Sequence, residues 1–101
     1  EHLKAIQKTM DEIEEKLHEV EKVFINSYTV KQRLVGVGVL TKEDVIDLSA
    51  VGPIARASGV NMDHRATGYS AYKHLNFEPI VKYDGDSYAR VEVRIQEIYQ
   101  A

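Results

Sequence analysis

Cysteine is absent from the 101 residues of the sequence. Its absence excludes disulfides, thiolate metal ligands and cysteine nucleophiles within the chain. No apolar run approaches the roughly 18 residues needed to cross a bilayer, and the N-terminal residues lack the apolar core of a secretory signal peptide. These absences favour a cytoplasmic protein.

Positive charge is scarce at the start of the chain. Residues 1–27 hold seven acidic residues against four lysines, whereas residues 28–101 hold nine acidic residues against nine Lys and Arg. No stretch combines clustered cations with interleaved aromatic residues, which is the usual footprint of a nucleic-acid-binding protein. We therefore expect no nucleic-acid partner.

Metal-ligand patterns are also missing. The sequence has four histidines, which are His2, His18, His64 and His74. None has a second histidine four residues away or an accompanying carboxylate motif, so the spacing predicts no metal site within the chain.

Three neighbouring residues in a glycine-rich loop, Asp63, His64 and Arg65, could supply acid–base chemistry. No serine nucleophile in a glycine frame accompanies them. A loop carboxylate more often accepts backbone N–H groups or an arginine fork. We therefore expect no catalytic residue here, and expect Arg56 to pair with Asp63 or Asp86 and hold the loop.

An amphipathic helix is predicted for residues 1–27. Its apolar residues recur at alternating spacings of three and four, and they are Leu3, Ile6, Met10, Ile13, Leu17, Val20 and Phe24. Such a helix is about 35–40 Å long, more than a domain of this size covers by itself. We therefore expect self-association of the isolated chain or packing against further protein.

A short helix, loops and strands are predicted for residues 28–85. The segment LVGVGVL, interrupted by Gly36 and Gly38, is typical of a short extended piece. Thr41, with Asp44 three residues later, approximates a capping box for a short helix. Pro53 is typical of the first position of another helical turn that ends before Gly59.

A C-terminal helix is predicted for residues 86–101. Val91, Val93 and Ile95 alternate as in a strand, but apolar residues also recur at helical spacing from Tyr88 onward. We prefer the helix because Asp86 can cap its first turn. The sequence thus predicts a single α+β domain over residues 1–101, with long N- and C-terminal helices packed together around an irregular, glycine-rich middle containing one or two short strands.

Four motifs in order carry a family resemblance: GVGVLTKED, GPIARASGVNMDHR, YSAY and GDSYAR. They resemble the large subunit of membrane-associated, energy-converting nickel–iron hydrogenases and its homologue in respiratory complex I, the NADH-quinone oxidoreductase. The resemblance covers residues 35–98 and implies that the chain is an internal segment of a larger hydrogenase or complex I large-subunit fold.

The resemblance implies an oxidoreductase subunit on the cytoplasmic face of a membrane. Its partners would be an iron–sulfur small subunit, membrane subunits and the remainder of its own large subunit. The parent would hold a nickel–iron centre in the hydrogenase branch, or bind quinone in the complex I branch. A nickel–iron centre needs Cys-x-x-Cys pairs, so this chain would carry no cofactor or metal ligand, support the redox cavity and be inactive alone.

The residues that match the family's motifs are expected to be structural or to line the cavity. They are Gly52, Pro53, Arg56, Ser58, Gly59, Asp63, Arg65, Tyr72, Gly85, Asp86, Tyr88 and Arg90. The stretch HRATGYS departs from the pattern, because relatives usually carry a charged residue and a proline before the tyrosine. Ala89 stands where the complex I branch usually has aspartate, which favours the hydrogenase branch. A further alternative is a small helical protein-interaction module with no redox role.

Overall fold

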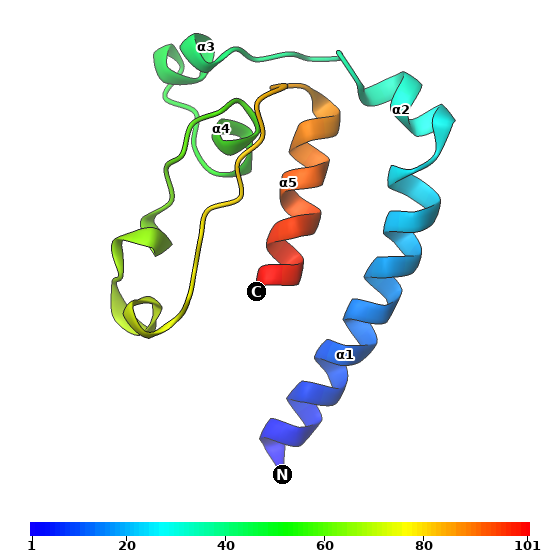
Figure 1. The fold of residues 1–101 in the computed structure, drawn as a ribbon, viewed down its shortest axis with the longest axis vertical. Coiled ribbons are helices and arrows are strands. Elements are labelled where there is room, and N and C mark those ends of the chain that lie inside the picture. The colour runs from blue at the N-terminus through cyan, green and yellow to red at the C-terminus, as the bar shows by residue number, and fades with distance from the viewer. The chain divides into compact units, whose positions relative to one another are not determined.

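Every regular element of the structure is a helix (Figure 1). The computed structural model describes residues 1–101. It contains no strand, so the predicted α+β class is wrong. The chain divides into two units, Glu1–Gln32 and Arg33–Ala101. The predicted packing of the first helix against the last, and the single domain, stay predictions.

The first unit consists mainly of α1, His2–Val20, which continues into a π-helical turn, η1, Glu21–Ile25. A helix is thus present where one is predicted for residues 1–27, but it ends at Ile25. No residue of α1 is buried, and most of its apolar seam is exposed, including Leu3, Ile6, Met10, Ile13, Val20 and Phe24. No helix of the chain is long and apolar enough to span a membrane.

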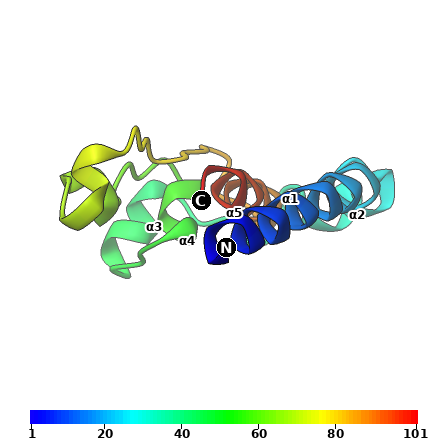
Figure 2. The ribbon, with the colours of Figure 1, turned by 90° about the horizontal axis from the view of Figure 1, so that it is seen from below.

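The second helix, α2, covers Tyr28–Leu34 and runs across the boundary between the two units. The second unit contains three further α-helices. α3 covers Lys42–Asp47, α4 covers Pro53–Ala57, and α5 covers Ser87–Gln100. Two short 3-10 turns, η2 (His64–Thr67) and η3 (Ser70–His74), lie between α4 and α5 in the sequence. Figure 2 shows α3 and α4 on the same side of α5, as Figure 1 does.

The capping residues and the proline in the sequence predicted the starts of α3, α4 and α5 correctly. The Thr41 hydroxyl accepts from the Asp44 N–H at 3.1 Å, while the Asp44 carboxylate accepts from the Thr41 N–H at 2.9 Å, which completes the predicted capping box. Pro53 begins α4 as predicted. The Asp86 carboxylate accepts from the Ala89 N–H at 2.8 Å and caps α5. The helix chosen for residues 86–101 is therefore confirmed.

The extended piece predicted at LVGVGVL forms no strand, because its backbone bonds go to the start of α5 instead of a ladder. Gly36 donates its N–H to the Asp86 carboxylate at 2.7 Å, and the Val37 carbonyl accepts from the backbone N–H of Ser87 at 3.0 Å. Gly36 and Gly38 have φ values of +69° and +61°. Such left-handed residues turn the chain and cannot continue a strand.

The core of the second unit is small and lies where α4 meets α5. Ala57, Ala89 and Val93 form its buried centre, and Ile80 packs against it. Alanines at the contact let the two helix backbones approach closely. The loop before α5 joins the same contact, because the Gly85 N–H donates to the Ala57 carbonyl at 2.9 Å.

Gly85 is the most tightly enclosed of the six glycines. Its φ is +65°, and a Cβ at this position would collide with the carbonyl oxygen of Leu40. The close approach also makes a hydrogen bond, from the Leu40 N–H to the Gly85 carbonyl at 2.9 Å. Gly36 has a similar φ of +69°, but a Cβ there would meet nothing within 4 Å.

We therefore predict that Gly85→Ala destabilises the chain much more than Gly36→Ala. The backbone conformation alone costs about 1–2 kcal/mol at either position, and the collision at Gly85 adds roughly 1–3 kcal/mol of overpacking. Urea unfolding followed by circular dichroism measures both variants. Equal losses would show that the approach of Leu40 to Gly85 is not tight in solution.

Candidate functional site

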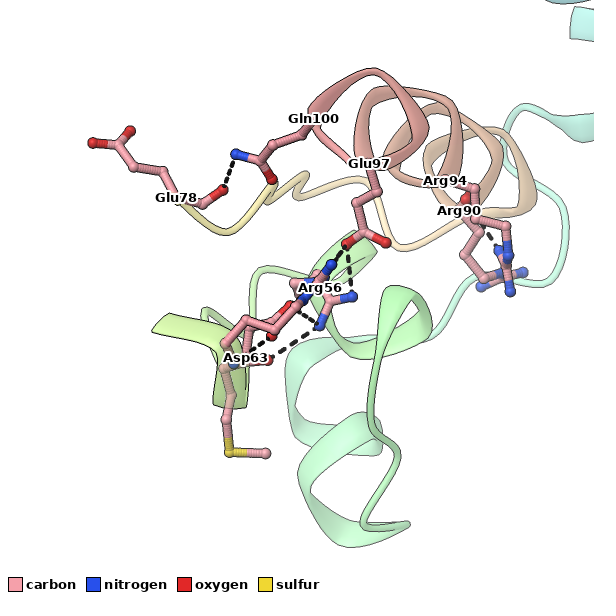
Figure 3. A network of polar contacts seen from close by, with 9 residues as sticks. Arg56, Asp63, Glu78, Arg90, Arg94, Glu97 and Gln100 are labelled. Carbon is pink, nitrogen blue, oxygen red and sulfur yellow. Dashed lines mark hydrogen bonds and ion pairs between the residues drawn. The ribbon is translucent and has the colours of Figure 1, made fainter. Parts of the chain in front are cut away.

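A buried arginine stands at the centre of the glycine-rich loop. Arg56, on α4, is only 5% exposed. Its Nε donates to Glu97 Oε1 of α5 at 2.7 Å, and its Nη2 lies 2.6 Å from the same oxygen. Its Nη1 lies 2.9 Å from Asp63 Oδ2 and donates to the Met62 carbonyl at 3.3 Å. Figure 3 shows the guanidinium between the two carboxylates.

The sequence around Arg56 explains why a cation can be buried here. Its neighbours Ala55 and Ala57 are fully buried, so α4 lies close to α5 and the arginine reaches Glu97. An isolated buried charge is strongly unfavourable unless it is paired and hydrogen-bonded. Carboxylates on both sides of Arg56 meet that requirement.

Asp63 is held by a second arginine as well. Its carboxylate accepts from Arg65 Nε at 3.0 Å and from Arg65 Nη2 at 2.7 Å, a bidentate pair. It also accepts from the Arg65 backbone N–H at 3.0 Å, which caps η2. The Arg65 side-chain bonds lower the pKa of Asp63 to about 2, and the charge of Arg56 adds to the effect. The same pairing raises the pKa of Arg65.

The four side chains form one charge-balanced cluster, Arg56, Asp63, Arg65 and Glu97, in which Arg65 Nη2 also lies 3.8 Å from Glu97. A carboxyl with a pKa of about 2 is ionised at neutral pH and is a poor general acid or base. The expected pairing of Arg56 with Asp63 is confirmed. Its pairing with Asp86 is not observed, because Asp86 caps α5 instead.

A second polar cluster surrounds the first turn of α5. Arg90 donates from Nη1 to the Gly85 carbonyl and from Nη2 to the Gly38 carbonyl, both at 2.8 Å. Its Nη2 also donates to Ser87 Oγ at 3.0 Å. The Ser58 hydroxyl, at the end of α4, donates to the Leu40 carbonyl at 2.8 Å. The Arg90 bond to Gly38 ties the GVGVL segment to α5, and the Ser58 bond to Leu40 ties it to the end of α4.

The remaining motif residues lie outside both clusters. Gly52 is the N-cap residue of α4 with φ +71°, and Gly59, with φ +82°, lies against the Tyr83 ring. Tyr72 lies on η3, with its ring centroid 5.8 Å from that of Phe77. Tyr88 is half-buried on the first turn of α5. The structure contains no group of three or more His, Asp or Glu side chains that could hold a metal.

Sequence reasoning missed Glu97. It lies 41 residues from Arg56 along the chain, inside a helix whose other charges are exposed or half-buried. No local motif distinguishes it from an ordinary surface glutamate. Only the contact between α4 and α5 reveals that it faces the arginine.

Comparison with known proteins identifies the class of the chain. The family described as "Respiratory-chain NADH dehydrogenase, 49 Kd subunit" matches residues 1–101. A subunit of the NADH-quinone oxidoreductase of Dehalococcoides mccartyi is 40% identical over 102 aligned positions, covering 100% of this chain and 28% of the relative. The corresponding subunit of Rickettsia akari is 35% identical over 100 residues, covering 98% of this chain and 26% of the relative.

A solved structure agrees with these relatives. A chain in the structure described as "Structure of the membrane-bound sulfane sulfur reductase (MBS), an archaeal respiratory membrane complex" matches with a TM-score of 0.89 and 35% identity. The match covers 97% of this chain and 26% of that chain.

The fold and the matches define a segment of a respiratory-chain subunit family. The chain belongs to the family of the 49 Kd subunit of respiratory-chain NADH dehydrogenase. The resemblance drawn from the four motifs is therefore confirmed. The chain spans about a quarter of the length of these two curated relatives.

Removal of Arg56 tests the charge-balanced cluster. Arg56→Ala leaves Glu97 without its main partner, and breaking a buried ion pair costs about 3–5 kcal/mol. Arg94→Ala is the matched control, because Arg94 is exposed on the same helix as Glu97. We expect a large fall in melting temperature for Arg56→Ala and almost none for Arg94→Ala. Similar melting temperatures for the two variants would contradict the cluster's structural role.

The depressed pKa of Asp63 predicts a pH dependence. A carboxyl with a folded-state pKa of about 2, against an ordinary value of 3.8, adds stability that is complete above pH 3.8 and is lost as the pH falls toward 2. The difference in unfolding free energy between the native chain and Asp63→Asn should therefore shrink by about 2 kcal/mol over that range.

The control for this titration is Asn61→Ala, which removes an exposed side chain and no carboxyl. Its difference from the native chain should stay nearly constant as the pH falls. A difference for Asp63→Asn that is equally constant would contradict the ionised pair with Arg65.

Proposed function

We propose that this segment supports the redox cavity of a large subunit without performing the chemistry. The single observation that carries the proposal is the charge-balanced cluster, because each of its ionised groups is already paired with another group of the same chain. An ionised carboxylate held by two arginines stabilises a loop but does not exchange protons readily at neutral pH.

We further propose that the complete protein takes part in quinone reduction. The curated relatives are named as subunits of NADH-quinone oxidoreductases, which supports this branch. Hydrogenase chemistry is the second candidate, and Ala89 is the residue that favours it. A nickel–iron centre needs thiolates, so Cys-x-x-Cys pairs elsewhere in the complete protein would identify that branch, whereas their absence would support quinone reduction.

The proposed location is the cytoplasmic face of a membrane, as a peripheral part of a larger complex. The relatives are named as subunits, and the solved neighbour is a respiratory membrane complex. The proposed partners are an iron–sulfur small subunit, membrane subunits and the remainder of the large subunit. Iron–sulfur clusters would lie in the small subunit.

A helical interaction module without a redox role is the alternative function. The exposed apolar seam of α1 is the observation that favours it. Under this alternative the isolated chain would self-associate through the seam of α1. A complex in which the seam is lacking would retain its redox activity.

The test of the supporting role uses the assembled complex with Arg56→Lys in this segment. Lysine keeps the charge but cannot reproduce the forked contacts to Glu97 and Asp63. We expect faster thermal inactivation of the complex and an unchanged turnover rate per assembled complex. Arg94→Lys is the control and should change neither quantity.

A severalfold loss of turnover at unchanged assembly and thermal stability would contradict the proposal. Such a result would mean that Arg56 acts on the reacting groups. Quinone reduction by the isolated chain would contradict it as well, because the segment is proposed to be inactive alone.

A further inference from the structure

We draw no further inference here: the strongest candidate, the apolar cavity of about 310 Å³ between α3 and the loop that follows α4, carries none because nothing in the structure shows what covers it.

Discussion

The second unit depends on one buried cation. Arg56 is enclosed between Asp63 in the loop and Glu97 on α5, at 2.9 and 2.6 Å. Because an unpaired charge at this depth is costly, the loop and the helix are each constrained to bring a carboxylate to the arginine. The backbone of α4 adds a further link, since the Arg56 carbonyl accepts from the Lys82 N–H at 2.9 Å.

The start of α5 depends on a second constraint, the tight packing of backbone around Gly85. Asp86 accepts a hydrogen bond from the Gly36 N–H, and Arg90 donates to the Gly38 carbonyl. Motif residues far apart in the sequence thus meet around one helix terminus. The glycines and the arginine of these motifs fix the shape of this terminus through backbone hydrogen bonds.

Local chemistry made much of the fold predictable. The apolar seam predicted α1, the capping residues Thr41 and Asp86 predicted the starts of α3 and α5, and the motif order predicted the family. The strand predicted around Gly36 is absent. The β-branched residues there match a strand pattern, but the Gly36 N–H and the Val37 carbonyl form their hydrogen bonds with the start of α5. Glu97 could not be predicted, because its role depends on a contact between two helices that no local pattern encodes.

The coupling between Arg56 and Glu97 is the most direct test of this account. A double-mutant cycle with Arg56→Met, Glu97→Gln and the combined variant isolates the pairwise free energy from packing changes. The account predicts a coupling of about 1.5–3 kcal/mol in urea unfolding, because the pair is buried and charge-assisted. Additivity within about 0.5 kcal/mol would mean that the two residues act independently, and would contradict the dependence of the fold on the buried cation.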